Sequence, residues 1–266
     1  MDNTTIKSTL FPVVEVPAIG KFPKNANYTE ENTKDTGYKF VVREDTDQVL
    51  SCMTNSYKLI TNDELYSTVS PIMKECGAHH LESRTFSDGA RTSWKWKFPD
   101  IKVDIGDGDL VNPEMTIRNS YDGSLEASAL AGAFRLVCSN GMVIGVILAK
   151  SGIRHITGND SKDFLDLVTK TINRTKGVFT DDFPKFAETK VKNSDIQKVI
   201  ELFPTGDVID ALVSHIIGKP PKTYWDLLNA ATWVATHYMN RNREATHKAE
   251  SKIYPTILRL VDKAQA

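Results

Sequence analysis

The sequence predicts an α+β protein, with a β-rich N-terminal half that holds a mixed or antiparallel sheet and one or two packed helices, followed by a helical C-terminal half. One observation is a period of two in residues 91–98, typical of a strand with one buried face. Another is the helical spacing of apolar residues from Ser161 onward. We therefore predict an extended N-terminal arm at 1–37, a β-rich core domain at 38–158 and a helical region at 159–266.

The first 37 residues are predicted to form the arm, because they contain three prolines and a polar stretch that disfavour long helices. Two short β-favouring runs at 38–42 and 49–53 then flank a polar connection and predict a hairpin. Asn62 or Asp63 can cap the next helix, in which apolar residues recur at helical spacing up to Gly77.

Strands are predicted after Gly77 at 91–98, 101–105 and 115–119. Residues 125–136 are ambiguous, because their alanine content favours a helix whereas their alternation allows a strand. From Ser161 the period is helical, and further helices are predicted at 194–203, 207–217, 224–238 and 245–264.

Composition excludes several classes of protein. Lysine and arginine total 33 and aspartate and glutamate 34, so the net charge of −1 gives no global positive field, and any polyanion site must be a local patch. The three cysteines are an odd number without a CxxC pair, which indicates neither a disulfide framework nor a cysteine zinc site. A signal-peptide pattern and an apolar run of membrane-spanning length are both missing, so we expect a cytoplasmic protein without membrane association.

Four stretches carry a family resemblance over about residues 38 to 240. They are Asn119-Ser-Tyr-Asp-Gly-Ser124, Phe134-Arg-Leu-Val-Cys-Ser-Asn-Gly-Met142, Ile153-Arg-His-Ile-Thr157 and Trp225-Asp-Leu-Leu-Asn-Ala-Ala-Thr232. In this order and spacing they resemble the phage/plasmid-like proteins of domain-of-unknown-function family 932. The resemblance implies a phage or plasmid origin, and hence the host cytoplasm. The layout of the first half is also loosely similar to phage single-strand-annealing recombination proteins of the RecT and Red-beta kind, which implies a homo-oligomer.

Residues 91–98 supply the first candidate binding residues. Arg91, Lys95 and Lys97 alternate with Trp94 and Trp96, and cations interleaved with rings suit a single strand, because the charges hold phosphates and the rings stack on bases. The alternative is that the aromatic residues form core and the lysines are solvated. Even then, Lys95 and Lys97 can face a phosphate track.

A second group of candidates lies in the densest polar part of the chain. Arg118, Arg135 and Arg154 suit phosphate oxygens, because a guanidinium group donates several hydrogen bonds. The alternative is structural, with Asn119 and Asp122 capping turns and the arginines satisfying buried carbonyl groups.

The sequence gives little support for a catalytic site or a metal site. Cys138 and His155 could form a nucleophile and base, but Cys138 sits in an apolar run typical of a buried thiol. The histidines form no zinc-ligand pattern, so we expect no metal. No catalytic motif is present either, so we expect no cofactor and favour a non-enzymatic function, while a cleft that held Cys138, His155 and an acid together would favour an enzyme.

These observations lead to two hypotheses. The first is a phage- or plasmid-encoded protein that binds single-stranded DNA along a basic groove of the β-rich half and promotes strand annealing and recombination, as a homo-oligomer. The alternative is an interaction module that binds and modulates a host protein. A continuous positive surface would favour DNA, whereas an exposed apolar patch would favour a protein partner.

Overall fold

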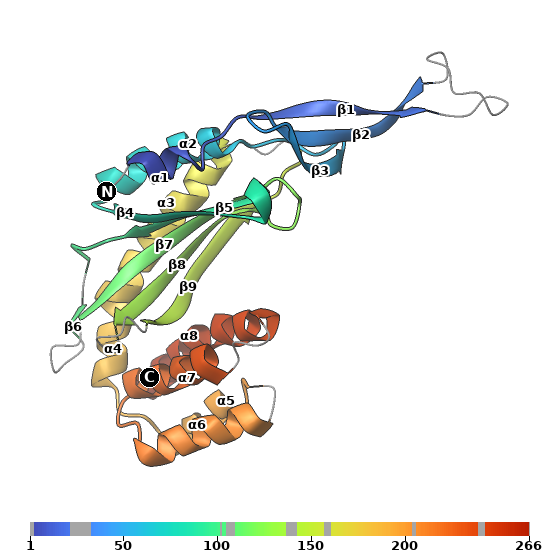
Figure 1. Ribbon diagram of the computed structural model, residues 1–266. Coiled ribbons are helices and arrows are strands. Elements are labelled where there is room, and N and C mark those ends of the chain that lie inside the picture. The colour runs from blue at the N-terminus through green and yellow to red at the C-terminus, as the bar shows by residue number, and fades with distance from the viewer. Residues whose placement is uncertain are drawn as a thin grey trace. The chain divides into compact units, whose positions relative to one another are not determined.

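The computed structural model describes residues 3–21, 33–101, 103–104, 110–136, 143–156, 161–203, 206–238 and 243–265. The chain forms two compact units. Unit 1 comprises residues 1–97, 115–129 and 151–170, and unit 2 comprises 98–114, 130–150 and 171–266. Described strands dominate the first half and helices the second (Figure 1), which confirms the predicted α+β class.

A three-stranded antiparallel sheet belongs to unit 1, in the order β1 (Val13–Lys21), β2 (Thr33–Arg43) and β3 (Gln48–Thr54). The β2–β3 pairing confirms the predicted hairpin, and Asp47 takes a positive φ of 55° in its connection. One face of the sheet packs inward through Val13 and Val41, together with the Phe11 ring.

The N-terminal segment differs from the predicted arm. A short helix, α1 (Asn3–Lys7), precedes β1, and Thr9, Phe11 and Val13 are already buried. Pro17 is compatible with β1 because β1 is an edge strand, and the β1–β2 register is irregular between Pro17 and Ile19. The segment from Asn3 therefore contributes to the core of unit 1, whereas the sequence placed the start of the fold near Tyr38.

The larger sheet has the strand order β4-β5-β7-β8-β9, with β6 paired to β7. Its strands are β4 (His79–Phe86), β5 (Arg91–Lys97), β6 (Val103–Asp104), β7 (Leu110–Ser120), β8 (Ala127–Leu136) and β9 (Val143–Ile153). The ambiguous segment 125–136 is thus mainly a strand. A tight 3₁₀ turn, η2 (Ser87–Gly89), joins β4 to β5, and Gly89 is required there because its φ is +102° and an added Cβ would lie 2.9 Å from the Phe11 ring.

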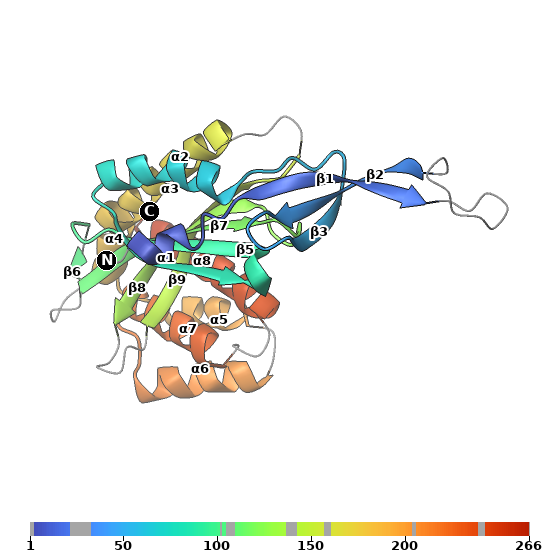
Figure 2. The same cartoon turned by 45° about the horizontal axis from the view of Figure 1, so that its top comes forward.

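Helix α2 (Asn62–Glu75) packs on one face of the β4–β5 pair. Its cap is Thr61, whose Oγ1 accepts a hydrogen bond from the Glu64 amide at 3.1 Å, and not Asn62 or Asp63 as predicted. The Tyr66 ring lies 5.7 Å from the Trp94 ring and 5.9 Å from the Trp96 ring, between centroids. Figure 2 shows α1 close to α2 and to the β4–β5 pair.

Helices build most of unit 2. Helix α3 (Ser161–Gly177) begins in unit 1 and continues into a π-helical segment (Val178–Asp182), and the later helices are α4 (Phe183–Glu188), α5 (Asn193–Ile200), α6 (Gly206–Gly218), α7 (Tyr224–Tyr238) and α8 (Arg243–Gln265). The predicted helices at 194–203, 207–217, 224–238 and 245–264 are therefore confirmed. Buried Asp195 on α5 accepts hydrogen bonds from the Tyr224 hydroxyl on α7 and from Lys198, both at 2.6 Å, which ties α5 to α7.

Candidate functional site

Strand β5 separates an aromatic face from a charged face. Trp94 and Trp96 are 0% and 1% exposed on the side of α2, whereas Arg91, Lys95 and Lys97 are half-buried on the other side. The alternative interpretation of the aromatic residues as core is therefore confirmed. The alternation also leaves the three predicted cations together on one face, where binding by them stays a prediction.

Neighbouring strands add to this face. Ser93 on β5 pairs with Arg84 on β4, and Arg91 pairs with Phe86, so these side chains lie on the charged side of the β4–β5 pair. On β7, Arg118 alternates with the buried Ile117 and Asn119. We define the charged face as Phe86 together with the five cations Arg84, Arg91, Lys95, Lys97 and Arg118.

The Phe86 ring was not anticipated as a candidate. It is 48% exposed, although a large aromatic side chain gains about 1.5–3 kcal/mol when it is fully buried. Its place on the charged face follows from the register of β4 against β5, since Phe86 lies opposite Arg91. Because β4 shows no clear alternation in the sequence, no sequence signal pointed to this ring.

Acidic residues reduce the positive charge of this face. The Arg91 guanidinium forms an ion pair with Asp122 at 2.9 Å, Arg84 pairs with Glu82, and Glu82 lies opposite Lys95. Burial alone would raise the pKa of Asp122, but hydrogen bonds from Ser124 and from Arg91 hold this pKa below its usual value. Asp122 therefore stays ionised and partly neutralises Arg91.

The other predicted arginines are not assigned to the charged face. Arg154 is exposed at the end of β9, next to His155, while Arg135 lies in β8 with its side chain outside the described residues. Cys138 also lies outside the described residues, so its pairing with His155 stays untested. Within the described ranges, His, Cys, Asp and Glu side chains form no group of three that could hold a metal ion.

A buried hydrogen-bond network contains Asn119, one of the residues in the densest polar part of the chain. Asn119 donates from Nδ2 to Asn62 Oδ1 and to the Ile60 carbonyl, both at 2.9 Å. Asn62 in turn donates to the Thr9 carbonyl at 2.8 Å and to Thr92 Oγ1 at 2.9 Å. The Asn62 backbone amide donates to the Tyr121 hydroxyl at 2.7 Å, and Trp94 Nε1 donates to Thr9 Oγ1 at 2.9 Å. We call Thr9, Asn62, Thr92, Trp94, Asn119 and Tyr121 the Asn62 network. Asn119 thus joins α2 to β7 inside the unit and is not part of a surface site.

His155 is buried at 6% exposure and packs flat on Tyr57, with ring centroids 5.2 Å apart. Its Nδ1 lies 3.3 Å from the Lys58 carbonyl oxygen, and its Nε2 is buried without a hydrogen-bond partner. Burial lowers the pKa of His155, although the Lys58 carbonyl opposes this shift. His155 therefore has the environment of a neutral core histidine.

We expect this histidine to make the protein less stable in acid. Because the pKa of His155 is lower in the folded state than the usual value of about 6.5, the unfolded chain binds the proton first as the pH falls. The stability that neutral His155 contributes above pH 6.5 is therefore lost progressively as the pH falls below 6.5. Urea unfolding at pH 7.5 and pH 5 should show a smaller acid loss in His155→Phe than in the natural sequence. Equal losses in the two proteins would contradict this assignment.

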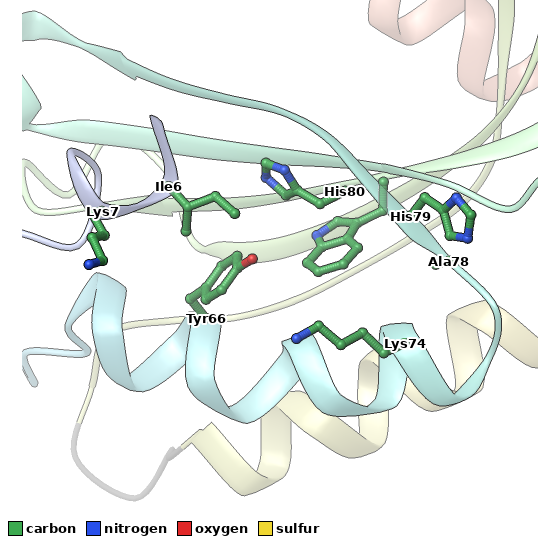
Figure 3. Close-up of a pocket in the computed structure, with 8 residues that line it drawn as sticks. Ile6, Lys7, Tyr66, Lys74, Ala78, His79 and His80 are labelled. Carbon is green, nitrogen blue, oxygen red and sulfur yellow. The ribbon is translucent and has the colours of Figure 1, made fainter. Parts of the chain in front are cut away.

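A pocket opens on the α2 side of the β4–β5 pair, away from the charged face. Its volume is about 700 Å³, and its lining side chains come from α1, α2, β4, β5 and the residue before β4 (Figure 3). They are Ile6, Lys7, Tyr66, Lys74, Ala78, His79, His80 and Trp96. The sequence did not single out this pocket, because its residues come together only through the packing of α1 and α2 on the sheet.

The fold and the charged face define an α+β protein with a mixed-charge sheet surface. The family model called Domain of unknown function (DUF932) matches residues 49–254. The chain therefore belongs to this family, in agreement with the resemblance of its motifs. No curated protein and no solved structure matches the chain significantly. None of the helices in the described ranges has the length and apolar character needed to cross a membrane.

Proposed function

We propose that the protein binds single-stranded DNA through the charged face of the β4-β5-β7 strands. The observation that carries the proposal is the exposed Phe86 ring on the same side of the sheet as five cations. Proteins that bind single strands combine basic residues, which follow the phosphates, with aromatic rings, on which the bases stack. Strand annealing by a homo-oligomer of phage or plasmid origin is the biological role that we propose for this binding.

The acidic residues on the charged face limit the affinity for DNA that we expect. Glu82 and Asp122 already neutralise part of the positive charge, so we expect moderate affinity and a strong dependence on salt. Lys95 and Lys97 should carry much of the phosphate contact, while Phe86 should supply stacking. These two contributions respond differently to salt, which allows them to be separated.

The test is fluorescence anisotropy of the full chain with a labelled oligothymidine at several salt concentrations, beside a duplex of equal length. The double variant Lys95→Gln with Lys97→Gln should bind about tenfold more weakly, and its salt slope should fall by about 1.4, because each contact with a single strand contributes about 0.7. Phe86→Ala should weaken binding about fivefold or more without changing the slope.

A matched control is available in unit 2, where Lys190 and Lys192 are exposed at the same spacing as Lys95 and Lys97. Their double substitution by glutamine changes the net charge equally and should leave the affinity within twofold. The proposal is wrong if the natural sequence shows no salt-sensitive binding at micromolar concentration, or if the Lys95 and Lys97 variant behaves like this control.

A second candidate function is the binding of a host protein, and a separate observation favours it. The outward face of the three-stranded sheet exposes several large apolar side chains, which are Val14, Val16, Tyr38, Phe40 and Val49, at 36–55% exposure. Contiguous exposed apolar side chains are typical of protein interaction sites. Absence of oligonucleotide binding would therefore favour this second function.

A further inference from the structure

The pocket beside α2 is walled mainly by rings. Tyr66 lies 5.9 Å from Trp96 at an interplanar angle of 27°, and the His80 ring meets Trp96 edge-on with centroids 5.1 Å apart. The His80 Nε2 lies 3.0 Å from Ser83 Oγ, which fixes the orientation of this ring. The pocket therefore has a preorganised aromatic wall, in which the half-buried Tyr66 and His80 rings can make offset or edge contacts with a flat ligand, while Trp96, at 1% exposure, supports these rings from behind.

Two of the rings, Tyr66 and His80, are held in their uncharged forms near neutral pH. Burial lowers the pKa of His80, so its imidazole stays neutral. Burial likewise raises the pKa of Tyr66, so its phenol remains a neutral hydrogen-bond donor. An aromatic ligand would thus meet an apolar wall with one hydroxyl group available on it.

The positive charge of the pocket lies at its rim. Lys7 from α1 and Lys74 from α2 are both exposed, and the described lining residues include no carboxylate. Figure 3 shows the Lys74 side chain extending along α2 toward Tyr66, with Ile6 and His80 on the opposite side of the space. In a chain whose net charge is −1, two lysines without a lining acid favour an anionic ligand.

We propose that this pocket binds a planar ring that carries an anionic group, of the size of a nucleoside monophosphate. The volume of about 700 Å³ lies within the range of about 300–1,000 Å³ for small-molecule sites. The ring packs beside Tyr66, and the phosphate lies near Lys7 and Lys74. The proposal does not rest on DNA binding by the charged face, because Trp96 and Lys97 point to opposite sides of β5.

Isothermal titration calorimetry of the full chain tests this site with dAMP, dTMP, deoxyadenosine and inorganic phosphate. We expect saturable binding of at least one nucleotide, with an affinity at least tenfold higher than for deoxyadenosine or phosphate alone. The double variant Lys7→Glu with Lys74→Glu should lose at least tenfold in nucleotide affinity. Both lysines are exposed, but each lies in the last turn of its helix, so the variant should lower the unfolding midpoint only slightly.

The matched control reverses the charge of two exposed lysines that line no part of the pocket, Lys21→Glu with Lys190→Glu, so that the net charge changes equally. Tyr66→Leu separates the ring contact from the charge and should weaken dAMP while leaving phosphate unchanged. The proposal is overturned if neither nucleotide binds at millimolar concentration, or if the Lys7 and Lys74 variant binds as the Lys21 and Lys190 control does.

Two sources of the same ligand chemistry are possible, a free nucleotide and the terminal nucleotide of a strand. Competition with a 5′-phosphorylated oligothymidine distinguishes them. If the oligonucleotide displaces the bound nucleotide, and still does so in the Lys95 and Lys97 variant, the ligand is the end of a strand. If the oligonucleotide does not displace it, the ligand is a free nucleotide. Either result supports the site. The two results can also be distinguished if the charged face binds no DNA.

Discussion

Substitution of Asn62 by alanine is expected to destabilise unit 1 by about 3–5 kcal/mol, because each buried group left without a partner costs about 1–3 kcal/mol. The Asn62 side chain is fully buried and makes three hydrogen bonds, to Thr9, Thr92 and Asn119. Alanine can replace none of them, and the partners have no access to water. Urea unfolding followed by circular dichroism should show a lower midpoint with an unchanged slope.

The control for this prediction is Asn55→Ala, because Asn55 is exposed beside the β2–β3 hairpin. It should change the stability by less than about 0.5 kcal/mol, as is usual for surface substitutions. A loss below 1 kcal/mol for Asn62→Ala would show that the Asn62 network relaxes or takes up water. Hydrogen exchange in β5 offers a second readout, since Thr92 and Trp94 both belong to this network.

The Asn62 network also shows which part of the fold the sequence could predict. The alternation of β5 and the helical spacing of α7 are local patterns, and both were predicted from the sequence. The bond between Asn62 and Asn119 joins residues 57 positions apart, and no local pattern reports it. The cap of α2 is Thr61 and not the predicted Asn62, because the Asn62 side chain makes its hydrogen bonds inside the core.

Strand β4 illustrates the same limit for the candidate site. The cations of β5 could be placed on one face from their alternation alone. Phe86 and His80 could not be placed, because their positions depend on the pairing of β4 with β5 and on the register shift between His80 and Glu82. The exposed ring of the charged face and one wall of the pocket therefore became visible only in three dimensions.

The aromatic core of unit 2 supports the second large prediction. Phe183 is fully buried, and its ring centroid lies 4.9 Å from those of both Phe179 and Trp225 and 6.2 Å from that of Phe186. Phe183→Ala should cost about 3–5 kcal/mol, since the transfer free energy of the ring is lost and a cavity remains. Phe183→Leu fills part of this cavity and should cost less than half as much.

Hydrogen exchange can locate this loss within the chain. Protection should fall first in α4, which carries Phe183, and in α7, which carries Trp225, because the removed ring packs between these helices. Ile217→Ala on α6 serves as the control, since Ile217 is 74% exposed and its truncation opens no cavity. Equal loss of protection in the β2–β3 hairpin of unit 1 would instead mean that the two units unfold as one cooperative structure, in which case the Asn62→Ala variant should lose protection in α7 as well.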